Sequence, residues 1–549
     1  MLAAAVVGFA VGRTGECRAD NPPLDPSPAI RAYGEEISQS VNSVYARRGE
    51  QTIWLGAPTR VTDNATAALA ALKQADTQGL DPYDYRVDEL EKALGRVSTQ
   101  ADIPQEELLR TDALMTTAVV MYTHDLAEGR LDPYRLGIVG GEAPPPRIDV
   151  AAFVDTIAHE GRVEETLAGL VPHHAEYERL RSALPHYKKL AAQGAWSSIA
   201  DGPTMKPGEP HAIARIDALA RRLHAEGFVE ERTIPKHPAG AVNAPYSETL
   251  VAGVRRFQSL HGLAVDGVVG PRTLIELNRT PADLVRTIEL NMERWRWVPD
   301  DLGAAHVRVN VPSFQLAAYE GNEQKLQMPI IVGQVTWGTP LFSDRIRIVI
   351  LNPYWNVPQS IARKEVLSKV FADRSYLIRE SMEIVSGSGS GAHVVSPHEI
   401  DWATYTPGTF PYRLRQRPGP LNPLGRIKFL FPNRFNVYMH DTPSGRLFAL
   451  PERALSHGCI RVAKPLDLAS WLFREDPKWS GTRVADAIKA GSQEAIRLSQ
   501  PVPLHIFYFT AVAGTEGKVE IYRDLYGIDA SLDRSLRELS AAPRTLPLR

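Results

Sequence analysis

The residues of this chain best suited to chemistry lie in one short stretch, Ser456-His457-Gly458-Cys459-Ile460-Arg461-Val462. An ordinary thiol is only a few per cent thiolate at neutral pH, and a nearby imidazole or positive charge raises that fraction. His457 and Arg461 lie within two residues of Cys459, and His440 ends a strand-like segment upstream. The pattern therefore predicts a cysteine nucleophile with a histidine base.

Gly458 has a separate use, because a residue without a side chain lets a substrate carbonyl approach the backbone. The amides of Gly458 and Cys459 could then face a developing oxyanion. Two other interpretations stay open. Cys459 could be a small buried hydrophobe, or it could bind zinc together with His457, His440 and Asp441. Zinc is the weaker alternative, because one thiolate is available and no paired ligand spacing occurs.

The composition excludes several classes of protein. The chain has 549 residues, with 62 basic and 64 acidic side chains and a formal net charge of -2. This near-neutral balance gives no indication of nucleic-acid binding. Two cysteines at this length exclude a disulfide-stapled scaffold. The sequence contains no uncharged apolar run of about 18 residues, which excludes a membrane-embedded protein. Hydrophobic residues make up 44%, which is typical of a globular protein of several domains.

Residues 1–19 are expected to be the remnant of an export signal. Leu2 to Gly12 form an apolar run of about the length of a signal-peptide core, ended by Arg13. Gly15-Glu16 before Cys17 is not the small-residue context of a lipoprotein, so no lipid attachment is expected there. Cys459 would then be the single cysteine of the mature chain.

Residues 20–205 predict a helical domain. Apolar residues recur at helical spacing between 67 and 75 and again between about 105 and 128, followed by Gly129 and Pro133. No chemistry is expected here, and the histidines of this region are expected to be surface or core residues: His124, His173 and His174.

Residues 206–282 predict a small module of three short helices. Val254-Arg-Arg-Phe-Gln258 followed by Asp266-Gly-Val-Val-Gly-Pro-Arg-Thr273 resembles the peptidoglycan-binding module of bacterial wall enzymes. The resemblance implies binding of glycan or stem peptides. A purely scaffolding role stays open, because the same residues also serve loop geometry.

From about residue 300 the apolar pattern alternates, as in Val307, Val309 and Val311, and again in Ile427, Phe429 and Phe431. Alternation with short Gly/Pro turns predicts a mostly antiparallel sheet or sandwich. We assign residues 283–530 to this domain and 531–549 to a C-terminal tail. Residues 372–425 break the pattern and predict a loop-rich insertion that acts as a lid or binding flap.

The histidine-bearing segment Asn436-Val-Tyr-Met-His440-Asp-Thr-Pro443, followed by SHGCIRV, resembles the L,D-transpeptidases with the YkuD-type catalytic fold. That family's large periplasmic subgroup has a helical scaffold domain, a peptidoglycan-binding module and a catalytic domain with a capping insertion. The resemblance implies an α+β multidomain chain with a β-sandwich catalytic domain. Further segments resemble this subgroup: Asn291–Trp297, Phe342–Arg345, Leu351–Pro358, Arg417–Gly425 and Phe431–Asn433.

Mapped onto this sequence, the family implies Cys459 as nucleophile and His440 as general base and acid. His457 and Gly458 would shape the site, and Arg461 would hold the cysteine loop or a substrate carboxylate. The family's base is often oriented by the backbone carbonyl that follows it, so the Asp441 side chain is the weaker choice of third member. The substrate-binding residues implied are Ser456, Tyr438, Arg426, Trp355 and Tyr354.

The reaction implied is a two-step acyl transfer without cofactor or metal. Cys459 attacks the carbonyl of the third stem residue, diaminopimelate, and the terminal D-Ala leaves. The side-chain amine of another diaminopimelate then forms a 3→3 crosslink. Water as acceptor would give L,D-carboxypeptidase activity, and an amine of an outer-membrane protein would give covalent anchoring. A non-catalytic wall-binding scaffold and a purely hydrolytic peptidase also stay open.

The resemblance further implies a periplasmic location, peptidoglycan stem peptides and glycan as partners, and acylation of Cys459 by carbapenems. Local charge agrees with an anionic substrate, because residues 413–434 contain six positive side chains and no acidic one. A solvated basic face is the alternative interpretation of that stretch. The aromatic residues Tyr354, Trp355, Trp337 and Tyr438 could line the cleft, and core packing is the alternative for each.

Overall fold

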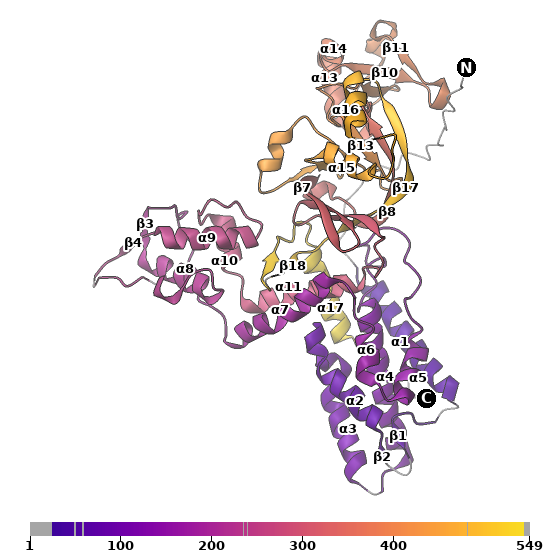
Figure 1. Cartoon of the computed structure of the whole chain (residues 1–549), viewed down its shortest axis with the longest axis vertical. Coiled ribbons are helices and arrows are strands. Elements are labelled where there is room, and N and C mark those ends of the chain that lie inside the picture. The colour runs from indigo at the N-terminus through magenta and orange to yellow at the C-terminus, as the bar shows by residue number, and fades with distance from the viewer. Residues whose placement is uncertain are drawn as a thin grey trace. The chain divides into compact units, whose positions relative to one another are not determined.

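The computed structural model describes residues 25–48, 51–56, 60–100, 102–233, 235–238, 240–479, 481–515 and 517–542. These residues divide into two compact units (Figure 1). The β unit is Leu302–Phe507, and the helical unit comprises Pro22–Asp301 and Tyr508–Arg549. The expected export signal, including Cys17, lies outside the described residues. None of the helices in the described ranges has the length and apolar character needed to cross a membrane.

The helical unit begins as a bundle, as predicted. Helix α4 is its central element, because it is buried along most of its length and contacts α1, α3 and α5. Side-chain caps start two of its neighbours: Thr62 accepts from the Ala65 amide and Asp149 accepts from the Ala152 amide. The helices are α1 (Ser27–Arg48), α2 (Asp63–Lys73), α3 (Val87–Thr99), α4 (Gln105–Glu128), α5 (Val150–Glu160), α6 (Val163–Ala168) and α7 (Ala175–Ala192), with a short hairpin of β1 (Leu55–Gly56) and β2 (Arg60–Val61).

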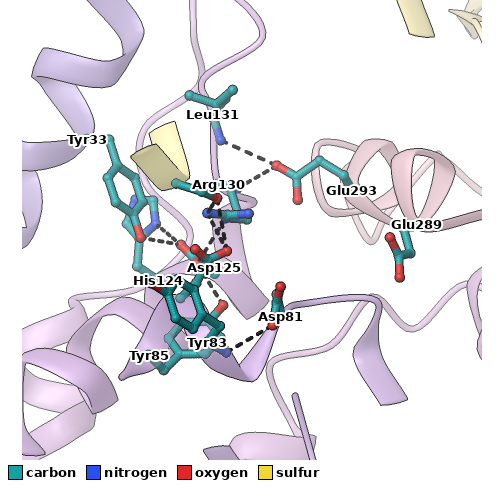
Figure 2. A network of polar contacts seen from close by, with 12 residues as sticks. Tyr33, Asp81, Tyr83, Tyr85, His124, Asp125, Arg130, Leu131, Glu289 and Glu293 are labelled. Atoms are coloured by element: carbon teal, nitrogen blue, oxygen red, sulfur yellow. Dashed lines mark hydrogen bonds and ion pairs between the residues drawn. The ribbon is translucent and has the colours of Figure 1, made fainter. Parts of the chain in front are cut away.

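Asp125, on the last turn of α4, is the centre of a buried polar network (Figure 2). The hydroxyls of Tyr33 and Tyr85 donate to its two carboxylate oxygens at 2.9 and 2.8 Å. Arg130 lies 3.7 Å from the same carboxylate. The Arg130 amide in turn donates to Glu293 of α11 (Pro281–Arg296) at 2.5 Å. Each buried charge of this network therefore has an opposite charge or several hydrogen bonds around it.

His124 joins the same network through Asp125 and Glu36, whose carboxylates lie 3.4 and 3.6 Å from its ring nitrogens. Burial alone would lower the pKa of His124. The hydrogen bonds and negative charge of Asp125 and Glu36 outweigh burial and raise the pKa to about 9. His124 is therefore a structural histidine of the core, as expected from the sequence.

The peptidoglycan-binding-like module has the three helices predicted: α8 (Ile213–Ala225), α9 (Glu248–Leu260) and α10 (Pro271–Leu277). Strands β3 (Pro210–Ala212) and β4 (Asn243–Pro245) form a small hairpin beside them. Gln258 holds the loop between α9 and α10, donating to Asp266 at 2.9 Å and accepting from the Gly267 amide at 2.8 Å. The sequence motif thus builds the loop that closes this small core.

The chain returns to the helical unit after the β unit. Strands β18 (Ala511–Ala513) and β19 (Val519–Ile521) form a hairpin that contacts α7, and α17 (Ile528–Ala541) contacts α11. Leu532, Leu536 and Leu539 form the buried side of α17. Most of the segment that the sequence suggests as a C-terminal tail is therefore helical.

The β unit is built on one sheet that closes on itself. Strands follow the order β15-β7-β16-β14-β13-β8-β17-β5-β6, and β6 also pairs with β7, so eight strands form a ring. All pairs are antiparallel except β14–β16, β15–β7 and β17–β5. The strands are β5 (Ala305–Asn310), β6 (Gln315–Glu320), β7 (Glu323–Gly333), β8 (Phe342–Leu351), β13 (Ile427–Leu430), β14 (Met439–His440), β15 (Ala454–Ser456), β16 (Ile460–Val462) and β17 (Glu494–Phe507).

This closed sheet corrects the prediction of a sandwich, although the mostly antiparallel character is confirmed. Alternation reports which side of a strand is buried, and a barrel and a sandwich bury strands in the same alternating way. The long strand β17 pairs with both β8 and β5, and its register shifts between Arg497 and Val502. An irregularity of this kind bends a strand and helps a sheet to close. Two helices, α15 (Pro465–Leu472) and α16 (Gly481–Ala490), contact this barrel.

The insertion contains loops, as predicted, and it also has a small sheet and an apolar core of its own. We call residues 355–416 the inserted subdomain. Its antiparallel sheet has the order β11-β10-β12-β9, and its core includes Ile384, Phe410 and Leu414. The expected flexible stretch Ser386–Gly391 forms the turn between β10 and β11. Its elements are β9 (Trp355–Asn356), α12 (Gln359–Ile361), α13 (Leu367–Ala372), α14 (Ser375–Arg379), β10 (Met382–Ser386), β11 (His393–Val395) and β12 (Arg413–Gln416).

Replacing His124 by Gln should flatten the pH dependence of stability of the helical unit. The raised pKa means that protonated His124 stabilises the fold fully below its ordinary value of 6.5, and that this contribution is lost as the pH rises through about 9. Between about pH 6 and 9.5 the wild-type free energy of unfolding should therefore fall by about 1–3 kcal/mol more than that of His124→Gln. Urea unfolding at both pH values measures this, and parallel losses in both proteins would contradict it.

Candidate active site

Three neighbouring strands of the barrel present a row of basic side chains. Lys428 of β13 lies opposite His440 of β14, which in turn lies opposite Arg461 of β16. Successive residues of a strand point to opposite faces, so the alternate residues Ile427 and Phe429 are buried in the core. The row therefore lies on the face of these strands that is turned away from that core.

Cys459 and Tyr438 lie on the same face, each two residues before a member of the row. The Ile460 amide donates to the Tyr438 carbonyl at 3.1 Å, which fixes these two segments side by side. The Tyr438 hydroxyl hydrogen-bonds to Cys459. Burial raises the pKa of Tyr438 well above its usual range, and the negative charge of Cys459 raises it further. Tyr438 is thus a neutral donor next to the partly buried Cys459.

His440 is buried and held in one tautomer. Its Nδ1 lies 2.5 Å from the Asp441 backbone oxygen, and because a carbonyl can only accept, Nδ1 carries the proton. Burial lowers the pKa of His440 to about 3, and the charges of Arg461 and Lys428 lower it in the same direction. The neutral ring therefore has an unprotonated Nε2, the atom a general base requires. The carbonyl contact expected from the family resemblance is present.

The Asp441 side chain has a different task. Its Oδ2 accepts from the Arg426 amide at 2.8 Å and its Oδ1 from the Thr442 amide at 2.7 Å. Gly425 has φ +60, and a Cβ added there would lie 2.4 Å from the Asp441 Cγ. The carboxylate thus holds the turn before β13, and orientation of His440 falls to the Asp441 backbone.

The cysteine loop is shaped by hydrogen bonds within itself. The Ser456 hydroxyl donates to the Cys459 carbonyl at 2.5 Å and accepts from the Gly458 amide at 3.1 Å. Gly458 has φ +103, a region that a residue with a side chain rarely adopts. Ser456 is therefore a loop-shaping residue. The Gly458 amide, which the sequence assigns to an oxyanion hole, donates to Ser456 in this conformation.

The turn after β7 supports the loop from the other side. Thr339 donates its hydroxyl to the Gly458 carbonyl at 2.9 Å and accepts from the Gly333 amide at 2.9 Å. The Gln334 amide donates to the Ser456 carbonyl at 2.9 Å. A Cβ at Gly333 would lie 2.0 Å from the Trp337 backbone oxygen. Only glycine fits this turn, and sequence reasoning missed both Gly333 and Thr339 because neither belongs to the recognised motifs.

His457 turns toward the inserted subdomain. Its Nε2 lies 3.2 Å from Glu365, and its ring meets Trp337 edge-on at 5.6 Å between centroids. The Lys364 ammonium lies 5.3 Å from the same Trp337 ring. A short π-helical turn of the subdomain, Ala362–Val366, thus lies against the cysteine loop.

The zinc alternative receives no support from this arrangement. His457 contacts Glu365, and Asp441 bonds to backbone amides, so these two side chains are engaged away from Cys459. Nowhere in the described part of the chain do three His, Cys, Asp or Glu side chains come together as metal ligands do.

Arg461 is partly buried, and burial lowers its pKa while the charge of Cys459 opposes that change. Its Nε is buried and has no hydrogen-bond partner among the described residues. Arg461 therefore retains an unused donor next to Cys459. Such a donor matches a substrate carboxylate.

The remaining predicted binding residues have other surroundings. Tyr354 lies under the Arg415 guanidinium, 4.3 Å from ring centroid to Cζ, and Trp355 packs on the core of the inserted subdomain. Arg426 has an exposed side chain and contributes its amide to Asp441. None of these contacts brings the three residues to Cys459.

Much of the predicted basic patch is also used structurally. Arg415 and Arg417 both bind Glu383, at 2.5 and 2.6 Å, and Arg413 donates to the Gly387 carbonyl at 2.5 Å. Lys428 is the member of that stretch that reaches the site. The sequence feature that points to Lys428 is a lysine at the outward position of an otherwise apolar strand. That strand pairs with one that ends in a histidine.

Three family models match the chain. "L,D-transpeptidase catalytic domain" matches residues 304–484, "Scaffold domain" matches 39–184 and "Putative peptidoglycan binding domain" matches 214–277. The chain therefore combines an L,D-transpeptidase (YkuD) catalytic domain, a peptidoglycan-binding domain and a scaffold domain.

A Haemophilus influenzae protein named "Putative L,D-transpeptidase" is 32% identical over 252 residues, 46% of this chain and 50% of that protein. The matched stretch thus spans about half the length of that relative. The crystal structure of L,D-transpeptidase (Yku) from Stackebrandtia nassauensis is 12% identical and covers 57% of this chain and 97% of its own, with a TM-score of 0.20. A TM-score this low establishes no shared arrangement.

Gly458→Ala should destabilise the β unit by about 1–2 kcal/mol, because the added side chain meets the backbone strain of a left-handed conformation. Thermal unfolding measures the loss. Gly445→Ala is the matched control, since Gly445 has no positive φ and open space around its Cβ position. Equal melting temperatures for Gly458→Ala and wild type would contradict the expected strain.

Proposed function

We propose that this protein is an L,D-transpeptidase that forms 3→3 crosslinks in peptidoglycan through a cysteinyl thioester. The observation that carries the proposal is the neutral His440, whose Nδ1–H is fixed on the Asp441 carbonyl. Its unprotonated Nε2 belongs to the same face as Cys459 in the adjoining strand. A fixed base beside a thiol is the arrangement that nucleophilic acyl transfer requires.

In the first step, His440 Nε2 takes the thiol proton while Cys459 Sγ bonds to the carbonyl carbon of the third residue of a donor tetrapeptide stem. The tetrahedral intermediate then expels the terminal D-Ala, whose nitrogen receives that proton from the imidazolium. The C–N bond breaks and a thioester remains. No external oxidant, metal or cofactor is needed to balance this step.

We assign the oxyanion of that intermediate to the amides of Gly458 and Cys459. The Gly458 amide reaches it by releasing the Ser456 hydroxyl, and a charged acceptor can replace a neutral one because its hydrogen bonds are stronger. Thr339 and Ser456 are assigned the positioning of these amides, given their bonds to the Gly458 and Cys459 carbonyls. His457 is assigned a contact with the inserted subdomain in place of chemistry.

In the second step, the side-chain amine of an acceptor diaminopimelate attacks the thioester carbonyl. The new amide bond forms, the C–S bond breaks and His440 takes the proton of the attacking amine. Water at this step would release a tripeptide, and an amine of an outer-membrane protein would become anchored to the wall. All three outcomes share one acyl-enzyme, so the product analysis below distinguishes them.

Substrate recognition is assigned to Arg461 and to the module at residues 206–282. The buried Nε of Arg461 suits a stem-peptide carboxylate, and the match to a peptidoglycan binding domain supports binding of the wall polymer. Tyr438, Arg426, Trp355 and Tyr354 remain proposed binding residues, of which Tyr438 is supported by its contact with Cys459. A peptidoglycan substrate lies outside the cytoplasm, and we assign the protein to the periplasm.

Cys459→Ala should abolish product formation from disaccharide tetrapeptides, because the nucleophile is lost while only one small side chain changes. Mass spectrometry should show, for the wild type alone, a dimer that lacks one D-Ala. A tripeptide monomer in its place would make the protein an L,D-carboxypeptidase. Turnover by the alanine variant would remove Cys459 from the mechanism.

His440→Gln should slow acyl-enzyme formation by about 10²–10⁴-fold, the usual effect of losing a positioned general base. Asp441→Asn is the matched control, because it keeps the backbone carbonyl that orients His440 and should change the rate by less than about tenfold. Carbapenem acylation followed by intact-protein mass spectrometry measures both rates. A larger loss in Asp441→Asn than in His440→Gln would transfer the orienting role to the carboxylate.

A further inference from the structure

Lys428 is partly buried, and no ion pair among the described residues joins it to a carboxylate. Two carboxylates of the segments around the cysteine loop have other partners. Asp441 accepts from backbone amides, and Glu365 binds His457. A partly buried ammonium loses hydration that a counter-charge normally replaces. The negative charge of Cys459 raises the pKa of Lys428 and so favours the protonated lysine.

The geometry supplies a physical connection between the two residues. The Lys428 ammonium lies 3.7 Å from the centroid of the Tyr438 ring, a cation–π contact. The hydroxyl of the same tyrosine hydrogen-bonds to Cys459. A cation over its ring draws electron density from the phenol and makes its O–H a stronger donor to the sulfur. Lys428 thus acts on Cys459 both through space and through Tyr438.

We propose that Lys428 is a positioning residue of this active site, which with Tyr438 stabilises the negative charge on the Cys459 sulfur. The anion forms when His440 takes the thiol proton, and it forms again when the thioester releases the sulfur in the second step. No atom is transferred to or from Lys428 in either event. The proposal rests on the proposed function, because it assigns the anionic sulfur a role in acyl transfer.

This assignment also gives His440 and Lys428 separate tasks. His440 moves protons and is kept neutral between the cations Lys428 and Arg461. Lys428 supplies charge and keeps its proton at neutral pH, because burial lowers its pKa only to about 8. Several titratable and charged groups surround Cys459. The neighbouring strands contribute Lys428 of β13, Tyr438 and His440 at β14, and Arg461 of β16. His457 belongs to the cysteine loop itself, and Glu365 and Lys364 of the inserted subdomain lie beyond that loop.

The test is the pH dependence of Cys459 alkylation by iodoacetamide, which reacts with the thiolate alone. Lys428→Met keeps the length of the side chain and removes its charge, so the midpoint of the alkylation profile should rise by about one pH unit or more. Lys428→Arg should restore a midpoint near that of the wild type. Lys364→Met is the matched control: it removes an exposed lysine that lies over Trp337, and its midpoint should equal the wild-type value.

A second measurement needs no substitution of Lys428 and covers the case in which Lys428→Met does not fold. If Lys428 stabilises the anionic sulfur, then the sulfur stabilises the ammonium by the same free energy. The NMR titration midpoint of ¹³C-methylated Lys428 should therefore be lower in Cys459→Ala than in the wild type. Coincident lysine midpoints in the two proteins, or coincident alkylation profiles for Lys428→Met and wild type, would overturn the proposal.

These experiments use no peptidoglycan, so their outcome is separate from that of the product analysis. A shifted alkylation profile in a protein that forms no crosslink would keep the charge assignment and reject the proposed reaction. Crosslinking with an unshifted profile would do the reverse.

Discussion

The hydrogen bond from His440 Nδ1 to the Asp441 backbone oxygen is the interaction on which the site depends. A buried histidine without charge could adopt either tautomer, and only the one with Nδ1–H leaves Nε2 able to accept a proton. The acceptor is the carbonyl of the next residue, so it cannot be lost by a side-chain rotation. The Asp441 carboxylate bonds to the Arg426 and Thr442 amides and so anchors the same peptide unit. Gly425 makes room for that carboxylate.

The second constraint is strand direction. Most pairs of the barrel are antiparallel, yet β14 and β16 run parallel, with Met439 opposite Ile460. Parallel alignment places Tyr438 beside Cys459 and His440 beside Arg461. With the same central pair, an antiparallel alignment would have brought His440 opposite Cys459 and Tyr438 opposite Arg461. The parallel pair thus gives the sulfur a hydrogen-bond donor as its direct neighbour and leaves the base one step along the strand.

The candidate residues that carry local chemistry can be named from the sequence, and their roles remain proposals. Cys459 and His440 are such candidates because an imidazole can take the proton of a thiol, and Gly458 is one because a residue without a side chain lets a substrate carbonyl approach the backbone. Closure of the barrel could not be predicted from the sequence. It depends on the pairing of β6 with β7 and on the register shift in β17, which pairs with the distant strands β5 and β8. The surroundings of Tyr354 and Trp355 could not be predicted, because an aromatic side chain does not reveal what it packs against. Tyr354 lies under Arg415, and Trp355 packs on the core of the inserted subdomain.

The place of Lys428 in the site could not be predicted for a related reason. The number of charged residues in a stretch of sequence does not show which of those charges are paired with opposite charges in the fold. In the helical unit Asp84 and Asp125 lie 2.8 and 3.7 Å from the Arg130 guanidinium, and Glu383 of the inserted subdomain pairs with Arg415 and Arg417. These cations are paired with carboxylates within the fold. Among the described residues no ion pair joins Lys428 of β13 or Arg461 of β16 to a carboxylate, and the Asp441 carboxylate bonds to backbone amides. The positive charge that remains there is therefore available to the sulfur anion and to a substrate carboxylate. Under the proposed function this imbalance has a use, because negative charge would form at this site during the reaction.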